Sequence, residues 1–209
     1  MSSHDAVVFV VDDDSRVREA LADLIASAGL DALLFESAGA FLGAARPDVP
    51  ACLLLDLRLP DINGLDVQRV LRGSNAPPIV FISGRADVQS SVRAMKAGAI
   101  EFLSKPVGDE QLLCAIDAAI TLDREARRKR EEVARLHRNY ERLTPREREV
   151  LPFIVAGFMN KETAHALGTS EITIGVHRAQ IMKKMLARSL AELIRMADRL
   201  GVGPRDRAV

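Results

Sequence analysis

The sequence has 209 residues, with 29 basic and 29 acidic side chains and a hydrophobic fraction of 48%, which is ordinary for a globular protein. No apolar run approaches the ~20 residues that a membrane-spanning helix needs, and the acidic N-terminus lacks the features of a signal peptide. We therefore expect a cytoplasmic protein without membrane contact. Cys52 and Cys114 lie in apolar segments and are expected to be small buried side chains rather than a disulfide or a metal site.

Charge is distributed unevenly along the chain. Residues 1–120 contain 17 acidic and 10 basic residues, a net charge of −7, whereas residues 121–209 contain 12 acidic and 19 basic residues, a net charge of +7. This asymmetry predicts an acidic domain followed by a basic domain that faces nucleic acid.

Short apolar runs alternate with amphipathic segments in the first half of the chain. The runs predict strands at residues 6–11, 31–35, 51–56, 78–83 and 101–104. Because the runs are almost continuously apolar, they are typical of a parallel sheet covered on both faces. Between them, residues 16–28, 65–71 and 88–97 carry apolar side chains at helical spacing. We predict a doubly wound α/β domain with a five-stranded parallel sheet over residues 1–121.

A long segment without glycine or proline follows, at residues 110–143. Its start is apolar enough to pack on the sheet, but residues 123–132 are charged on every side and must be solvated. We assign residues 122–142 to a helical linker. A dimeric coiled coil is the alternative, although the charged run interrupts the heptad pattern.

The last part of the chain, residues 143–209, is predicted to be an all-α domain of four helices. The sequences TPRE at 144–147 and SLAE at 189–192 each form a capping box, in which a hydroxyl side chain precedes an acidic residue by three positions. The expected helices span residues 145–156, 161–167, 171–186 and 190–200. Pro152 lies inside the first of them and should kink it.

Polar side chains concentrate where the predicted strands end. These residues are Asp12, Asp13 and Asp14 after the first strand, Asp56 at the end of the third, Ser83 at the end of the fourth and Lys105 after the fifth. The carboxyl ends of parallel strands lie on one edge of a sheet, so these side chains can converge. Neighbouring carboxylates repel one another unless a cation neutralises them, and oxygen ligands of this kind suit Mg²⁺.

Such a cluster supports a particular chemistry. The Asp56 carboxylate can attack phosphorus and form an aspartyl phosphate. Mg²⁺ and the Lys105 ammonium would stabilise the charge on the equatorial phosphoryl oxygens, and the Ser83 hydroxyl would donate to one of them.

The segments VVDDD, LLLDLRLPDINGLD, VFISGRAD and FLSKP, in this order, resemble the receiver domain of two-component response regulators over about residues 5–121. The resemblance implies that Asp56 accepts phosphate from a cognate histidine kinase. It also implies a Mg²⁺ site formed by Asp12, Asp13, Asp56 and the backbone carbonyl of Arg58. It assigns the remaining roles as follows: Ser83 is the switch hydroxyl, Lys105 the lysine of the site, Phe102 the reorienting aromatic residue, and Arg58 and Arg85 flank the phosphoryl site.

The basic half also resembles a known family. TPRE, NKETA and the run from His177 to KKM resemble the LuxR-type helix-turn-helix over about residues 143–199. Together with the receiver, they make the whole chain similar to the NarL/FixJ family, closest to its FixJ-like members. The resemblance implies binding to promoter double-stranded DNA.

The predicted recognition helix, residues 171–186, has a buried seam and an opposite face that would enter the major groove. Gln180 can bond base edges, while Thr173, Val176 and Ala179 can meet thymine methyl groups. The cationic residues are assigned to phosphates: Lys161, Arg178, Lys183 and Lys184. Gly175 also falls on this helix, where family members often carry a polar contact residue, so base readout at this position is expected to be thin or shape-dependent.

The last predicted helix carries Leu193, Ile194 and Ala197 on one stripe, which either dimerises on DNA or packs in the core.

We expect a transcription regulator rather than an enzyme, dimeric after phosphorylation, with RNA polymerase as a further partner. One rival is a phosphohydrolase of the haloacid dehalogenase type with Asp12 as its nucleophile. The other is a DNA-binding protein whose receiver is never phosphorylated.

Overall fold

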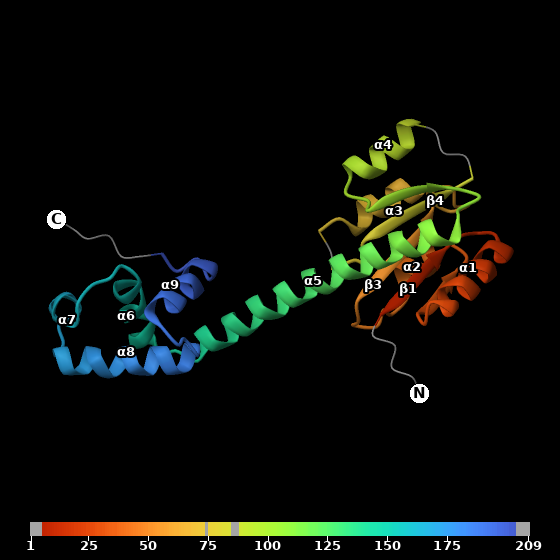
Figure 1. The fold of residues 1–209 in the computed structure, drawn as a ribbon. Helices are drawn as coiled ribbons and strands as arrows, with labels where there is room; N and C mark the ends of the chain where they lie inside the picture. Colours follow the sequence, from red (N-terminus) through yellow and green to blue (C-terminus); the bar gives the residue numbers. More distant parts are fainter. Residues whose placement is uncertain (1–5, 74, 85–87, 204–209) are drawn as a thin grey trace. The chain divides into compact units, whose positions relative to one another are not determined.

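The computed structural model describes residues 6–73, 75–84 and 88–203. The chain divides into two compact units, Met1–Arg127 and Arg128–Val209, and each is described by itself. The N-terminal unit contains a parallel sheet in the order β2-β1-β3-β4-β5, which confirms the predicted architecture (Figure 1). Its strands are β1 (Val7–Val11), β2 (Asp31–Phe35), β3 (Ala51–Asp56), β4 (Ile79–Ser83) and β5 (Glu101–Ser104).

Helices cover both faces of this sheet. One face packs against α1 (Ser15–Ser27) and the first part of α5 (Asp109–Glu141), and the other against α2 (Ala38–Gly43), α3 (Gly64–Leu71) and α4 (Val88–Lys96) (Figure 1). Side chains alternate between the two cores along each strand, as the pleat requires. Because both faces are buried, every residue of β1, β3 and β4 is buried, which explains the continuous apolar runs.

Helix α2 was not among the helices predicted from apolar spacing. Its sequence AGAFLG is dominated by small residues, and Phe41 supplies its packing through edge contacts with the rings of Phe9 and Phe35, at centroid distances of 5.5 Å each. The N–H of Gly39 donates to the carboxylate of Asp61 at 2.8 Å, from the loop after β3. This hydrogen bond lowers the pKa of Asp61. Tertiary contacts therefore stabilise a helix that local sequence does not indicate.

Helix α5 contributes to both units. The buried Asp123 carboxylate accepts hydrogen bonds from the N–H of Ala51, at the start of β3, at 2.9 Å and from Nε of Arg127 at 2.8 Å, so the contact of α5 with the N-terminal unit continues past residue 121. In the C-terminal unit, Leu136 is buried in the core and Glu132 forms an ion pair with Arg199 at 2.9 Å. Burial within its own unit removes Leu136 from the seam of a coiled coil.

The C-terminal unit adds four helices to the end of α5, as predicted. They are α6 (Pro145–Val155), α7 (Asn160–Leu167), α8 (Glu171–Met185) and α9 (Leu190–Arg199). The predicted capping box at the start of α6 is confirmed, because the N–H of Thr144 donates to Glu147 at 2.7 Å and the N–H of Glu147 donates to the Thr144 hydroxyl at 3.3 Å. Helix α6 continues across Pro152 to Val155.

The two cysteines differ in their exposure. Cys52 is buried as expected, but Cys114 is exposed, because it lies on a side of α5 that does not face the sheet. The cysteine prediction was therefore half wrong: an apolar neighbourhood in sequence does not specify which side of a helix a residue occupies.

Among the described residues, no helix is both long and apolar enough to span a membrane.

Candidate functional site

Three carboxylates meet at the carboxyl edge of the sheet. Asp12 and Asp13 follow β1 directly, and Asp56 is the last residue of β3. One ligand oxygen from each lies within 4.8 Å of the others. Asp12 and Asp56 are buried, whereas Asp13 is exposed. This arrangement concentrates negative charge at the sheet edge, with one of the three carboxylates exposed to solvent.

Lys105 lies against the same cluster. Its Nζ is 2.5 Å from Oδ2 of Asp12 and 3.7 Å from Oδ1 of Asp56. The N–H of Lys105 donates to the carbonyl of Ser83 at 2.8 Å, which continues the pairing of β4 and β5 beyond the strands. Pairing of β4 and β5 therefore positions the backbone of Lys105. Its ammonium group extends from there to the carboxylates of Asp12 and Asp56, at the ends of β1 and β3.

The pKa of Asp56 is raised above its ordinary value of 3.8. Burial is the main cause, because it penalises the charged carboxylate, and the neighbouring charge of Asp12 acts in the same direction. The Lys105 ammonium and the N–H groups of Arg58 and Leu57 oppose the rise. A carboxylate in this position is stabilised when a further cation joins the cluster.

The other predicted residues of the receiver surround these carboxylates. Ser83 is buried at the end of β4, next to β3, and Phe102 on β5 is half-buried and stacks on Phe81 at a centroid distance of 5.9 Å. The N–H of Arg58 donates to Oδ2 of Asp56 at 3.3 Å, so its backbone lies next to the cluster. Arg85 lies outside the described residues.

Gly64 supports the loop that leaves Asp56. A Cβ atom at this position would lie 2.6 Å from the backbone carbonyl oxygen of Asp56 and 3.1 Å from Cα of Leu57. Real Cβ atoms do not approach backbone so closely, so only glycine fits without movement of the chain. Its N–H donates to the carbonyl of Leu57 at 2.9 Å.

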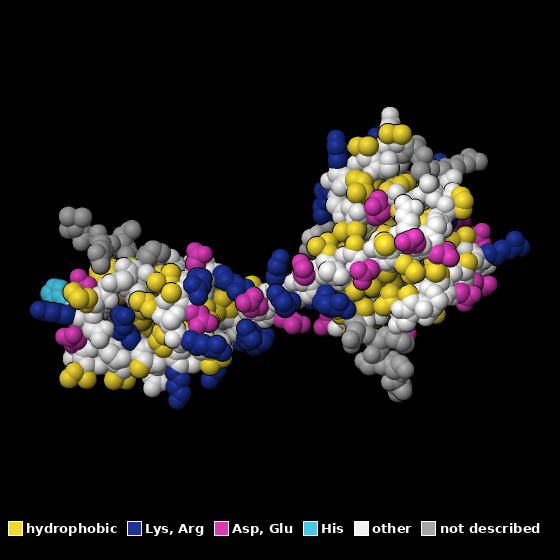
Figure 2. All heavy atoms as spheres, in the orientation of Figure 1, with side chains coloured by type: hydrophobic (Ala, Val, Ile, Leu, Met, Phe, Trp, Pro, Cys, Tyr) yellow, Lys and Arg dark blue, Asp and Glu magenta, His cyan; other side chains and the backbone are white. Residues whose placement is uncertain are grey.

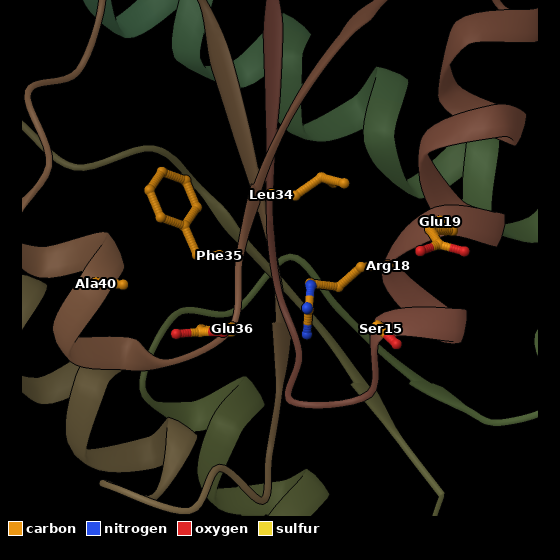
Figure 3. A pocket seen from close by; sticks show the side chains of 7 residues that line it. All are labelled: Ser15, Arg18, Glu19, Leu34, Phe35, Glu36 and Ala40. Carbon is orange, nitrogen blue, oxygen red and sulfur yellow. The ribbon is translucent and has the colours of Figure 1, made fainter.

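Two residues near the cluster have roles that the sequence analysis did not assign. Asp14, grouped there with the clustered carboxylates, is the N-cap of α1 and accepts from the N–H of Arg16 at 2.9 Å. Arg18 donates to the backbone carbonyl of Asp12 at 2.7 Å. Figure 3 shows the Arg18 guanidinium between α1 and β2, in a pocket that Glu19 and Glu36 also line. The available signal for Arg18 was a basic residue near the start of the helix that follows Asp12.

Helix α8 presents the surface predicted for DNA. Its core side is formed by Ile174, Ile181 and Met185, all buried. The opposite side exposes Ile172 and Val176, at 82% and 56% of their full accessibility. The other exposed residues on α8 predicted to contact bases or phosphates are Thr173, Ala179, Gln180 and Lys183. Figure 2 shows Lys and Arg side chains in number on the visible face of the C-terminal unit.

The remaining predicted contact residues differ in environment. Lys161 on α7 is exposed, whereas Arg178 is half-buried and donates to the carbonyl of Phe158 at 3.1 Å. The Lys184 ammonium binds the buried carboxylate of Glu147 at 2.7 Å, inside the same unit. Gly175 is half-buried, and a Cβ there would meet only the side-chain amide of Asn160, at 3.7 Å. Space therefore does not require glycine at position 175.

The apolar stripe of α9 divides between core and surface. Leu193 and Ala197 are fully buried against the other helices, which favours core packing for both. Ile194 is 37% exposed and Leu190 is 41% exposed, and they form the outer side of the helix. Of the apolar side chains that the structure describes on α9, Leu190 and Ile194 are the large ones left exposed.

Comparison with known proteins agrees with this architecture. Residues 8–117 match the family of response regulator receiver domains, and residues 141–197 match the luxR family of bacterial regulatory proteins. The fold and its two matched families define the class: DNA-binding regulators of two-component systems.

Similar proteins specify the family further. Nodulation protein W of Bradyrhizobium diazoefficiens is 48% identical over 202 residues, which cover 96% of this chain and 89% of that protein. The transcriptional regulatory protein FixJ of Azorhizobium caulinodans is 41% identical over 96% of both chains. The structure of the response regulator StyR has a TM-score of 0.86 and 44% identity, covering 94% of this chain and 100% of StyR. The chain belongs to the NarL/FixJ family of response regulators, with a receiver and a LuxR-type DNA-binding domain.

Proposed function

We propose that phosphorylation of Asp56 by a cognate histidine kinase switches this regulator between two states that differ in their binding to promoter double-stranded DNA. In this proposal residues 1–121 form the receiver, 122–142 the linker and 143–209 the DNA-binding domain. The observation that supports it most strongly is the convergence of Asp12, Asp13, Asp56 and Lys105 at one edge of the sheet. The protein would act as a switch rather than as an enzyme that turns over a substrate.

The cluster fits a divalent cation. Its donors are carboxylate oxygens, the ligands that Mg²⁺ prefers, and burial leaves Asp56 with a raised pKa that a cation would counteract. Asp12, Asp13, Asp56 and the backbone carbonyl of Arg58 would hold Mg²⁺, which supplies charge neutralisation for phosphoryl transfer. The Lys105 ammonium, which lies close to Asp12 and Asp56, already supplies one positive charge to this group of carboxylates.

Each residue of the site has a separate role in the proposed phosphoryl transfer. A carboxylate oxygen of Asp56 attacks phosphorus, while the phosphorus–nitrogen bond of the kinase phosphohistidine breaks and its electron pair returns to the imidazole. Lys105 then pairs with the phosphoryl oxygens instead of Asp56, and the Ser83 hydroxyl donates to one of them. Movement of Ser83 would make room for Phe102 to turn inward from its half-buried position.

The proposed readout of the switch is dimerisation. Helix α4 exposes Val88, Val92 and Met95 at 79%, 44% and 43%, with helical spacing that places them on one side. Phosphorylation would shift a pre-existing equilibrium toward a receiver that pairs through such a surface. Pairing of two DNA-binding domains on adjacent half-sites would raise affinity. RNA polymerase is a further partner proposed for the DNA-bound dimer.

The phosphorylation proposal is tested by mass. Incubation of the full-length chain with acetyl phosphate and Mg²⁺ should add a single phosphate, and intact-mass spectrometry measures it. The Asp56→Asn variant should gain none, whereas the control Asp66→Asn, whose carboxylate pairs with Arg69 at the surface, should behave as wild type. Light scattering should show a shift toward dimer in wild type and in Asp66→Asn, but not in Asp56→Asn. An unmodified wild type, or an adduct on Asp56→Asn, would exclude Asp56 as the phosphoacceptor.

The DNA proposal predicts a difference between an exposed lysine on α8 and a lysine of the receiver. Lys183→Ala removes an exposed cation from α8, so the slope of log affinity against log salt for a random-sequence duplex should fall by about 0.9. The measurement is fluorescence anisotropy over a salt series. Lys96→Ala, on α4 of the receiver, is the control and should leave the slope unchanged. An unaltered slope for Lys183→Ala would remove that residue from the phosphate contacts.

A further inference from the structure

Arg18 is a half-buried cation beside the carboxylate cluster that has no part in the proposed phosphoryl transfer. It lies near the start of α1, which begins at Ser15. Side chains of a helix point toward its N-terminus, so a long side chain at this position can reach back to the loop before the helix. Figure 3 shows the Arg18 side chain extending from α1 toward β2. Its Nη1 donates to the backbone carbonyl of Asp12 at 2.7 Å.

The stability of α1 does not account for a basic residue here. The N-terminal end of a helix carries partial positive charge, so a cation close to it is slightly unfavourable. No acidic residue lies in the first turn of α1 to compensate. The hydrogen bond to Asp12 provides a tertiary reason for arginine at position 18.

The contacted carbonyl lies at the point where the sheet ceases to fix the chain. Strand β1 ends at Val11, and the N–H of Asp12 still donates to the carbonyl of Phe35 on β2 at 3.2 Å. On the other side of the same residue, the carbonyl accepts from Arg18. The backbone of Asp12 is therefore held from both sides, by β2 and by α1.

This contact bears on the direction of the next side chain. The peptide group between Asp12 and Asp13 is planar, so a fixed carbonyl fixes the plane from which Asp13 continues. Both residues supply ligand oxygens to the cluster with Asp56. Asp13 is exposed, so packing restrains its carboxylate little and its direction depends on the backbone.

We propose that Arg18 is a positioning residue of the divalent-cation site. By holding the carbonyl of Asp12 it orients the following peptide group and thereby directs the Asp13 carboxylate into the cluster. This inference rests on the proposed Mg²⁺ site and adds to it a residue that does not touch the metal.

Charge and positioning predict opposite effects of Arg18 on metal affinity. A guanidinium repels a cation bound nearby, so removal of its charge alone should tighten binding of Mg²⁺. Removal of a group that orients a metal ligand should weaken binding, by about 10- to 100-fold in typical sites. The direction of the change therefore distinguishes the two effects.

The Mg²⁺ affinity of the unphosphorylated full-length chain tests the inference. It is measured from the backbone NMR signals of Asp13 and Leu57 during a titration with MgCl₂. Arg18→Met keeps a long apolar side chain without the donor, and its Kd should rise by about 10-fold. Arg16→Met removes an exposed cation from the same end of α1 and should leave the Kd unchanged or lower it. Arg18→Lys keeps the charge and a donor, so its Kd should lie between those of wild type and Arg18→Met.

Signals elsewhere in the N-terminal unit should keep their wild-type positions, which separates a loss of metal affinity from a loss of fold. If Arg18→Met does not fold, Arg18→Lys is compared with Arg16→Lys: a higher Kd for Arg18→Lys alone supports the inference, and equal values overturn it. An unchanged or lower Kd for Arg18→Met would overturn the role of Arg18 and leave the magnesium site intact. A wild-type chain without saturable shifts in Mg²⁺ would overturn the site itself, and this role with it.

Discussion

Replacement of Gly64 by alanine is expected to lower the unfolding free energy of the N-terminal unit by about 3 kcal/mol. The added methyl would lie 2.6 Å from the carbonyl oxygen of Asp56 and 3.0 Å from the ring of Phe81. The nearest atom is backbone at the end of β3, so relief requires movement of the strand end rather than of a flexible side chain. The loss is measured from the NMR signals of this unit in a urea titration.

The same substitution should also slow phosphorylation. Movement of the Asp56 backbone displaces the carboxylate from Asp12 and Lys105, and transfer of phosphate depends on that alignment. Gly43→Ala is the matched control, because a Cβ at Gly43 meets nothing within 4 Å and the residue ends α2. It should leave stability unchanged or raise it by up to about 1 kcal/mol. Equal stability of the Gly64→Ala and Gly43→Ala variants would refute the steric argument.

The second large effect is expected in the DNA-binding domain. Glu147→Gln should destabilise the C-terminal unit by about 2–4 kcal/mol, because it breaks a mostly buried ion pair and leaves the Lys184 charge uncompensated. Glu147 is 3% exposed, and its carboxylate accepts hydrogen bonds from Lys184 at 2.7 Å and from the N–H of Thr144 at 2.7 Å. The ion pair connects α6 to α8, the helix that presents the DNA surface. Thermal unfolding of the variant measures the loss.

A neighbouring ion pair supplies the control. Glu149 pairs with Arg146 at 2.7 Å, but both side chains are substantially exposed, at 54% and 38%. Exposed pairs of this kind contribute about 0–1 kcal/mol, so Glu149→Gln should unfold close to wild type. Comparable losses for Glu147→Gln and Glu149→Gln would show that burial does not strengthen the Glu147–Lys184 interaction. The expectation that Lys184 contacts phosphate stays a prediction, and any loss of DNA affinity in Lys184→Met must be compared with its loss of fold stability.

The Glu147 pair also predicts acid sensitivity. Burial opposes ionisation of Glu147, but the hydrogen bonds from Lys184 and Thr144 outweigh it and hold its pKa below the ordinary value of 4.5. A carboxyl group with a lowered pKa in the folded state stabilises the fold above its ordinary pKa, and this contribution is lost as pH falls through the folded-state pKa. Stability of the C-terminal unit should therefore decrease below about pH 4.5, and the decrease should be smaller in Glu147→Gln.

Local sequence patterns were sufficient for the sheet and for much of the candidate site. Apolar runs identified all five strands because both faces of a parallel sheet are buried. Since the carboxyl ends of parallel strands share one edge, the positions of Asp12, Asp56 and Lys105 at strand ends predicted that they would meet. The capping box at Thr144 was equally readable, because a cap involves residues only three positions apart. At Ser189 only half of the predicted box forms: the Ser189 hydroxyl accepts from the N–H of Glu192, but the Glu192 carboxylate accepts from the N–H of Arg188.

Contacts between distant segments could be found only in the tertiary structure. The hydrogen bond from Gly39 to Asp61, which supports α2, and the contact of Asp123 with Ala51 join residues that share no local pattern. The burial of Leu193 was undecided in sequence, because core packing and dimerisation require the same apolar stripe. The sequence by itself determined the five strands, the helices other than α2 and the positions of the polar residues at the strand ends, since periodicity and capping are local properties. Which polar groups are paired in the interior, and which apolar side chains stay exposed, depended on packing between elements far apart in the chain.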